Sequence, residues 1–372
     1  MRQRQIHELK IGQLVARVPI IQGGMGVGIS GVNLASAVAN AGGIGVISAV
    51  GLGMMEPDFK NNFKEANKRA LIKEIQKARK RTTGLIGVNI MVALSDYDDL
   101  VDGAIEAKAD ALFLGAGLPL KFSSNITTEV LKNMHTRIVP IVSSAKAVQV
   151  IFNFWSKKYN HVPDAVVVEG PKAGGHLGFK YEQITNPDYA LEKLIPQVAE
   201  AVGPFAEMFQ KEIPVIAAGG IFTGQDMHNI MELGADGVQL GTRFIATHEC
   251  DASPEFKQAF IDAKEEDLML IQSPVGLPGR ALRNRFLDEV TAGKKMPFSC
   301  PWKCLRTCDY KQAPYCIAKA LTQAKMGHLE NGFVFSGVNG YRIREIVSVQ
   351  DIINELIDEY AVVARKKSEC IV

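Results

Sequence analysis

Short apolar runs alternate with longer amphipathic segments over roughly the first 245 residues of the chain. Most of these runs are almost continuously apolar, which is typical of parallel β-strands that are covered on both faces. We predict strands at residues 18–25, 43–50, 85–92, 111–117, 137–144, 164–170, 213–220 and 237–244.

The segments between these runs have helical periodicity. Residues 33–42 run into the pair Gly42-Gly43, which favours a helix stop, and residues 58–81 and 223–236 carry apolar stripes. Eight β–α alternations in about 240 residues fit the α/β class and a TIM-type (β/α)8 barrel. An open, doubly wound sheet is the competing architecture, because the number of strands does not by itself prove closure.

The pattern changes after Phe244. Residues 248–340 are irregular and contain helical pieces without alternating strands, whereas residues 348–366 again have the apolar face of a helix. We therefore expect a barrel over residues 1–247 and a smaller, mainly helical cap or substrate region over 248–340. Residues 341–372 should form a C-terminal helix that packs back on the barrel.

Composition narrows the class of protein. The 372 residues are 47% hydrophobic and 22% charged, and 42 basic against 40 acidic residues give a net charge of +2. A net charge this small does not indicate nucleic-acid binding. We interpret the basic run in 58–81 as a solvated helix face. Neither a signal peptide nor a bilayer-spanning stretch is recognisable, so we expect a cytoplasmic protein with a small-molecule substrate and no membrane partner.

Glycines and polar residues gather where the predicted strands end. Catalytic groups of (β/α)8 barrels lie at the carboxyl ends of the strands, because the loops there converge on one mouth. Gly219-Gly220 after the seventh strand and Gly241-Thr242 after the eighth would present backbone N–H groups to a phosphate. A dinucleotide motif at 26–31 is rejected, because the second strand ends without the required acidic residue.

Several of these segments together resemble the nitronate monooxygenase family, formerly called 2-nitropropane dioxygenases, which also includes FMN-dependent enoyl-ACP reductases. The similar segments are "PIIQGGM", "GVNI", "VVVEGPKAGGHLG", "PVIAAGGI" and "GADGVQLGTRF", and "GLPGRALRN" looks like a further one. The resemblance implies a barrel that holds FMN without a covalent link. A homodimer is among the assemblies that we consider.

The resemblance also implies roles for individual residues. His176 matches the histidine that acts as a catalytic or substrate-positioning group, and a histidine near a flavin can accept a proton or orient an oxygen. Glycines permit close approach of the flat flavin ring. The residues expected to bind the cofactor are Gln22, Gly23, Gly24, Met25, Asn89, Glu169, Gly174, Gly175, Gly219, Gly220, Gln239, Gly241 and Thr242.

Four cysteines lie close together in the predicted cap. Cys300, Cys304, Cys308 and Cys316 have C-x3-C-x3-C-x7-C spacing, and the first three would share one side of a helix. Thiolates at this density suggest a zinc ion or an iron–sulfur cluster, although the spacing is standard for neither. A buried face of small residues is the competing interpretation.

Three functions follow from these observations. The first is an FMN-dependent oxidation of alkyl nitronates with O2, in which His176 deprotonates or anchors the substrate. The second is an NAD(P)H-dependent reduction of an enoyl thioester or a quinone. The third is an electron relay in which a flavin passes electrons to a metal cluster in the cap. FMN carries the redox chemistry in each of them.

Overall fold

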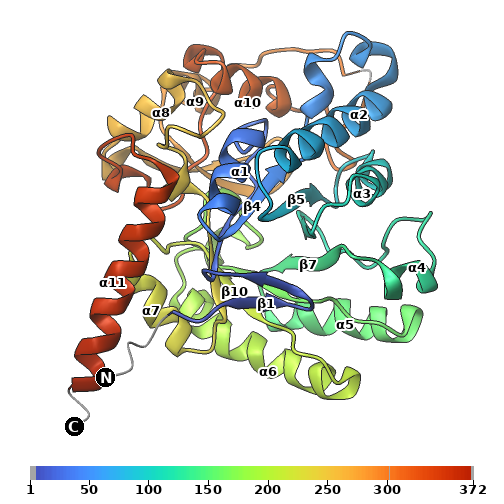
Figure 1. Cartoon of the computed structure of the whole chain (residues 1–372). Coiled ribbons are helices and arrows are strands. Elements are labelled where there is room, and N and C mark those ends of the chain that lie inside the picture. Colours follow the sequence, from blue (N-terminus) through green and yellow to red (C-terminus); the bar gives the residue numbers. More distant parts are fainter. Residues whose placement is uncertain (1–5, 301, 370–372) are drawn as a thin grey trace.

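Eight parallel strands form a closed barrel in the computed structural model, which describes residues 6–300 and 302–369 (Figure 1). The barrel closes because β10 pairs with both β8 and β11, and β11 pairs with β3. Each of the eight predicted strands is one of these, so the (β/α)8 prediction is confirmed. The strands are β3 (Ile20–Gln22), β4 (Ile44–Ser48), β5 (Leu85–Met91), β6 (Ala111–Gly115), β7 (Arg137–Val142), β8 (Val166–Glu169), β10 (Val215–Ala218) and β11 (Gly237–Leu240).

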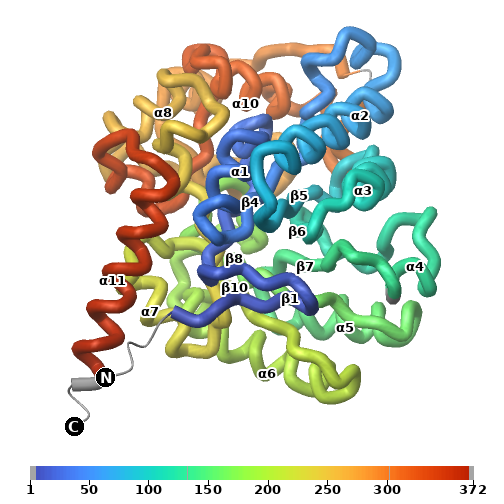
Figure 2. The backbone as a smooth tube through the Cα atoms, in the orientation of Figure 1, coloured from blue at the N-terminus to red at the C-terminus, as the bar shows by residue number. Residues whose placement is uncertain are grey.

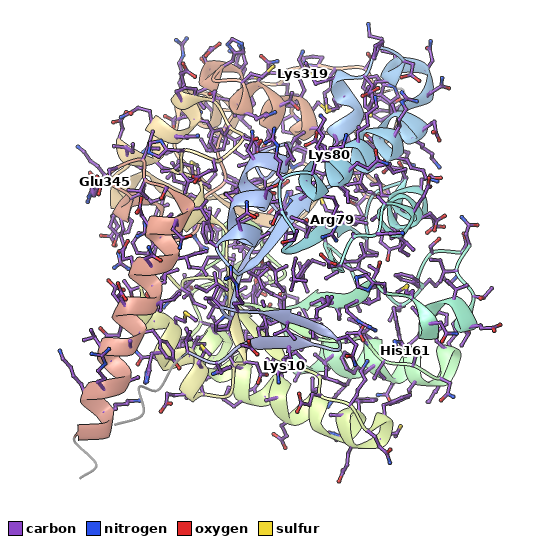
Figure 3. All side chains as sticks on the ribbon, in the orientation of Figure 1. Lys10, Arg79, Lys80, His161, Lys319 and Glu345 are labelled. Atoms are coloured by element: carbon purple, nitrogen blue, oxygen red, sulfur yellow. The ribbon has the colours of Figure 1, made fainter. Side chains whose placement is uncertain are left out.

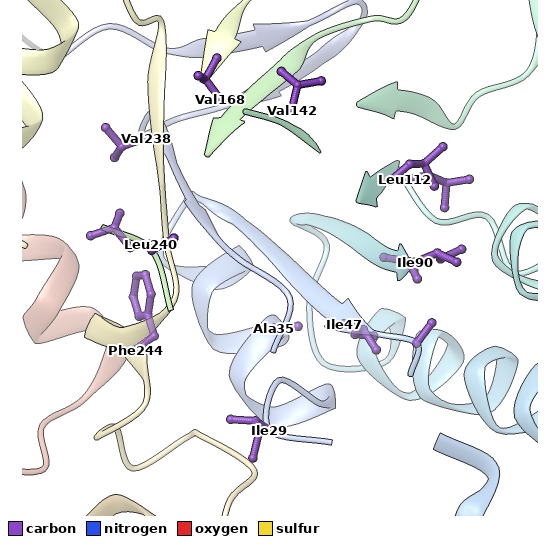
Figure 4. Packing of buried hydrophobic residues seen from close by; sticks show 14 of the residues in the cluster. Ile29, Ala35, Ile47, Ile90, Leu112, Val142, Val168, Val238, Leu240 and Phe244 are labelled. Carbon is purple, nitrogen blue, oxygen red and sulfur yellow. The ribbon is translucent and has the colours of Figure 1, made fainter. Parts of the chain in front are cut away.

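Helices surround the barrel on its outside (Figures 1 and 2). Apolar side chains on the outer face of the strands, such as Ile47, Ile90 and Leu112, belong to one buried cluster with helix residues such as Ala35 (Figure 4). This packing buries each strand on both faces, which explains the continuous apolar runs. The helices are α1 (Val32–Asn40), α2 (Phe59–Arg79), α3 (Tyr97–Glu106), α4 (Thr128–Asn133), α5 (Ala145–Tyr159), α6 (Leu191–Phe209) and α7 (Gly224–Glu232).

A short hairpin, which the pattern of apolar residues does not predict, places apolar side chains in the barrel interior. Strands β1 (Leu9–Ile11) and β2 (Leu14–Ala16) pair in antiparallel fashion around Gly12, whose φ of 57° suits a tight turn. Leu9 and Ile11 belong to the same buried cluster as Phe113, which lies on the inner face of β6. The hairpin therefore fills space inside the barrel with apolar side chains.

The region after the barrel contains both helices and strands. The helices are α8 (Pro254–Ile261), α9 (Arg285–Thr291) and α10 (Ile317–Lys325). Strands β12 (Leu268–Gln272) and β13 (Pro278–Leu282) form a hairpin. Strand β13 also pairs with β9 (Gly175–His176), which gives a three-stranded sheet. The expectation that this region lacks strands is wrong at the hairpin, which brings cap residues next to the loop after β8.

The last helix, α11 (Val349–Glu369), lies along α7 (Figure 1). The backbone N–H of Gly224 donates to the Glu359 carboxylate at 2.7 Å, and a Cβ on Gly224 would lie 2.2 Å from the Leu356 carbonyl oxygen. The close approach of the two helices therefore requires a glycine. No helix in the described part of the chain is long and apolar enough to cross a bilayer.

The basic run of α2 is paired with acidic neighbours. Arg69 contacts Asp58 at 2.5 Å, and Lys73 contacts Glu56 at 3.1 Å. Arg79 ends the helix and Lys80 follows it, and both are labelled in Figure 3. Arg79 is half-buried and Lys80 is exposed. This arrangement agrees with a solvated helix face.

Candidate active site

A cavity of about 770 Å³ lies between the carboxyl ends of the barrel strands and the cap. Active sites of (β/α)8 barrels are built at this end, and the volume is within the range of cofactor and substrate sites. All the residues predicted to bind a cofactor line the cavity except one. These lining residues are Gly23, Gly24, Met25, Asn89, Glu169, Gly174, Gly175, Gly219, Gly220, Gln239, Gly241 and Thr242, and the predicted catalytic residue His176 lines the cavity with them.

Gln22 is the exception. Its side chain is fully buried and bonds to the backbone of β4, where its Oε1 accepts from Val46 N–H at 3.1 Å. Its Nε2 also donates to the Gly23 carbonyl oxygen. Side chains alternate along a strand, so Gln22 lies on the same side as Ile20, which packs toward the surrounding helices. The structure therefore gives Gln22 a role in joining β3 to β4.

Glycines make one wall of the cavity flat. A Cβ on Gly24 would lie 2.3 Å from the Asn89 Cβ, and a Cβ on Gly23 would lie 3.2 Å from the Gln239 side chain. Asn89 is itself held by a bond from its Nδ2 to the Phe113 carbonyl oxygen at 3.1 Å. The side chains of Asn89 and Gln239 can therefore reach the wall, and a planar ligand could approach the backbone closely.

The loops after β10 and β11 form another end of the cavity. Gly219 and Gly220 have φ values of 93° and 88°, a left-handed conformation that favours glycine. The Thr242 hydroxyl accepts from Gly337 N–H at 2.9 Å, and Asn339 donates to the Gly220 carbonyl oxygen at 2.8 Å. Loops seven and eight are the usual phosphate site of these barrels.

Arg243 adds an unsatisfied donor at this end. Its guanidinium lies 4.7 Å from the centre of the Phe222 ring and pairs with Glu355, but its buried Nε has no hydrogen-bond partner among the described residues. A buried donor without a partner is unfavourable, and Arg243 also lines the cavity. The residues present therefore fit an anionic phosphate group.

His176 lies in the two-residue strand β9 and lines the cavity. Its Nε2 is 2.7 Å from the Ser273 hydroxyl, and its ring centre is 5.1 Å from that of Phe335. Burial lowers the pKa of His176 to about 4, so the imidazole is neutral at physiological pH. Ser273 and Phe335 could not be predicted from the sequence, because both reach His176 only through the tertiary fold.

Glu169, the last residue of β8, is a second titratable group on the cavity wall. Burial raises the pKa of its carboxyl group to about 7. Its protonation state therefore changes close to physiological pH. Strongly perturbed titratable groups that share a cavity are typical of functional sites.

We predict that Glu169→Gln alters how stability depends on pH. The folded pKa of about 7 lies above the ordinary value of 4.5, so the folded protein binds more protons between these values. The free energy of unfolding of the wild-type protein should then fall as pH rises from about 4.5 to about 7. The Gln variant has no carboxyl group at this position, so its free energy of unfolding should not fall for this reason. In thermal melts of flavin-free protein, the Tm advantage of the variant should grow from about pH 5 to about pH 8. A constant difference would contradict the raised pKa.

The cavity also has an apolar end. Phe59 at the start of α2 packs against Trp302 in a tilted arrangement, with ring centres 4.9 Å apart and an angle of 54° between the ring planes. The Trp302 indole N–H donates to the Lys60 carbonyl oxygen at 3.0 Å. Met54 and Leu305 line the same region. This end offers space for an apolar part of a substrate.

The cysteine segment is irregular in its described residues, so the helix that would place three cysteines on one side does not form. Backbone bonds tie it to the loop after β5: Ser95 N–H donates to the Cys304 carbonyl oxygen at 3.0 Å, and Arg306 N–H donates to that of Ala93 at 2.9 Å. Leu305 forms an antiparallel bridge with Leu94. These tertiary bonds outweigh the local preference for a helix.

The four thiols nevertheless come near one another, around a cavity of about 10 Å³. Burial and the three neighbouring thiols raise the pKa of Cys304 to about 12, and all four cysteines are free. In residues 6–300 and 302–369, no three His, Cys, Asp or Glu side chains form a group that could hold a metal ion. The predicted zinc or iron–sulfur site at Cys300, Cys304, Cys308 and Cys316 is therefore not supported.

Comparisons with known proteins identify the family. The family model described as "Nitronate monooxygenase" matches residues 7–359. A "Probable nitronate monooxygenase" from Staphylococcus aureus is 30% identical over 298 residues, which cover 73% of this chain and 77% of that protein.

Solved structures agree with this assignment. FabK from Thermotoga maritima superposes with a TM-score of 0.72 and 31% identity, covering 94% of this chain and 95% of that one. A nitroalkane oxidase from Streptomyces ansochromogenes has a TM-score of 0.70 and 24% identity over 96% and 98% of the two chains, which supports the fold. The chain is an oxidoreductase that belongs to the nitronate monooxygenase family.

Proposed function

We propose that the protein is an FMN-dependent oxidoreductase that oxidises alkyl nitronates with O2. The observation that carries this proposal is the placement of a neutral His176 in a glycine-walled cavity that also has a phosphate-type end. Membership in the nitronate monooxygenase family supports the same reaction class.

The described residues fit FMN. Gly23, Gly24 and Asn89 would hold the flavin ring, while Gly219-Gly220 and Gly241-Thr242 would hold the ribityl phosphate. Bound FMN would accept an electron pair from the substrate and return it to O2. The unsatisfied Arg243 Nε supplies a further donor close to the phosphate end.

His176 would bind the reacting end of the substrate. A neutral imidazole has one N–H donor and one acceptor nitrogen. The donor can hydrogen-bond an oxygen of an anionic nitronate, and the acceptor can take a proton from the acidic carbon of a neutral nitroalkane. The Ser273 hydroxyl at 2.7 Å holds Nε2, which leaves Nδ1 for the substrate.

A second candidate function is an NAD(P)H-dependent reductase of an enoyl thioester or a quinone. The apolar end of the cavity, with Phe59 and Trp302, favours it because this space exceeds what a small nitronate needs. The 31% identity to FabK also favours it. We do not propose the electron-relay function, because no observation supports a metal cluster.

Steady-state assays separate the two candidates. Under the first proposal, propionate 3-nitronate should cause oxygen uptake without any nicotinamide. Under the second, NADH or NADPH should be consumed in the presence of an enoyl thioester or a quinone, and the nitronate alone should cause no uptake. Absence of both activities in flavin-loaded protein would refute both functions.

We predict that Ser273→Ala lowers turnover about fivefold, because a neutral hydrogen bond contributes on the order of 1 kcal/mol. FMN content should not change, because the Ser273 side chain contacts His176 and its own loop. Ser273→Thr keeps the hydroxyl and should restore most of the turnover. Equal turnover in Ser273→Ala and wild-type protein would contradict the orienting role of Ser273.

A further inference from the structure

The loop that carries His176 is held from outside the barrel by the β12–β13 hairpin. Strand β13 pairs with β9 in antiparallel register, with Gly279 opposite His176 and Arg280 opposite Gly175. Leu177 N–H donates to the Pro278 carbonyl oxygen at 2.9 Å, which extends the pairing by one residue. The hairpin is therefore the structural support of the histidine, although it lies about 100 residues away in sequence.

Arg280 is the charged residue at the centre of this support. It is 7% exposed, and its Nη1 donates to the carbonyl oxygens of Pro171 at 2.7 Å and Ala173 at 2.6 Å. Burial lowers its pKa to about 10, so it remains a cation at physiological pH. No ion pair within residues 6–300 and 302–369 includes Arg280. Its described partners are thus carbonyl oxygens of the loop after β8.

Three successive carbonyl groups of this loop are bound by residues from the C-terminal region. Arg280 binds those of Pro171 and Ala173, and Val338 N–H donates to that of Lys172 at 3.1 Å. These hydrogen bonds orient the three carbonyl groups toward the C-terminal region. They therefore determine the path of the backbone that leads to Gly174, Gly175 and His176. Burial of a cation without a carboxylate partner is unfavourable. The hydrogen bonds of Arg280 to the loop must therefore compensate for the cost of burying its charge.

We propose that Arg280 is a positioning residue, which holds the loop after β8 so that His176 keeps its place on the cavity wall. The two N–H groups of Nη1 lie in the fixed plane of the guanidinium, so this one nitrogen can bind both carbonyl oxygens at once. A lysine at this position would keep the charge and lose this fixed planar geometry. The effect on the loop is independent of the proposed function, whereas the effect on turnover rests on it.

The test compares Arg280→Met and Arg280→Lys with a control, Arg283→Met, by hydrogen exchange of the flavin-free proteins. Arg283 follows the same hairpin, but its side chain is 59% exposed and pairs with Asp288. In Arg280→Met, exchange in residues 171–177 should accelerate about tenfold or more, because charge-assisted hydrogen bonds are lost, while strands β4–β6 stay unchanged. Arg280→Lys should give a smaller acceleration, and the control should match wild-type protein.

Turnover supplies a readout that a purely structural role would not change. Arg280→Met should lower kcat with little change in KM, and Arg280→Lys should recover part of kcat. Wild-type exchange in residues 171–177 of a folded Arg280→Met would overturn the proposal. If Arg280→Met does not fold, Arg280→Lys decides, and wild-type exchange of its loop would overturn the proposal equally. If wild-type protein binds no flavin, the proposed function fails, but the exchange result still stands.

Discussion

Replacement of His176 by asparagine is expected to leave FMN binding intact and to lower turnover by about 10²- to 10⁴-fold, the usual contribution of a positioned acid–base group. His176 contacts Ser273 and lines the cavity, and its ring packs against Phe335. Asparagine keeps a polar group of smaller size, but its amide cannot accept a proton. The loss should therefore appear in kcat, while the flavin spectrum and Tm change little.

The control for this variant is His328→Asn. The His328 side chain is 56% exposed and does not line the cavity. This control should keep wild-type turnover. Unchanged turnover in His176→Asn, with normal FMN content, would show that His176 has no part in the chemistry.

Replacement of Gly241 by valine should weaken FMN binding strongly without unfolding the protein. The φ of Gly241 is −106°, which other residues adopt, and a Cβ would meet only Met25, at 3.6 Å or more. The added side chain would extend into the cavity at its phosphate end. Overpacking of this size costs about 1–3 kcal/mol, which corresponds to roughly tenfold to hundredfold weaker FMN binding.

Gly203→Val is the matched control for this substitution. Gly203 lies in α6, where a Cβ would meet nothing within 4 Å, and it does not line the cavity. FMN titration of the two flavin-free variants, followed by fluorescence quenching, would compare their affinities. Full FMN affinity in a folded Gly241→Val would contradict the placement of the phosphate at the loop after β11.

The barrel could be predicted from the sequence because each of its strands is buried on both faces. Runs such as residues 85–92 and 164–170 are apolar for that reason, and they became β5 and β8. The hairpin β1–β2 has only three residues in each strand, and β9 has two. Such short strands exist because of tertiary pairing, which leaves little trace in the local pattern.

Site residues that follow a barrel strand can be predicted from the sequence, whereas site residues that reach the cavity through tertiary pairing cannot. Gly219-Gly220 and His176 follow barrel strands, so their place in the fold identified them. Ser273 and Arg280 act on the loop after β8 across 97 or more positions in sequence. The motif predicts that Gln22 lies on the cavity wall, but strand alternation directs its side chain away from the cavity, toward the backbone of β4.

We propose that the protein binds FMN in this cavity and oxidises a nitronate there. The decisive experiment mixes the flavin-loaded protein with propionate 3-nitronate in the absence of oxygen and follows flavin absorbance in a stopped-flow instrument. We expect the yellow absorbance to bleach within the turnover time and to return on admission of O2, and we expect His176→Asn to bleach roughly a hundredfold more slowly or slower still. Protein that binds no FMN, or whose flavin is bleached by NADH or NADPH but not by the nitronate, would contradict it.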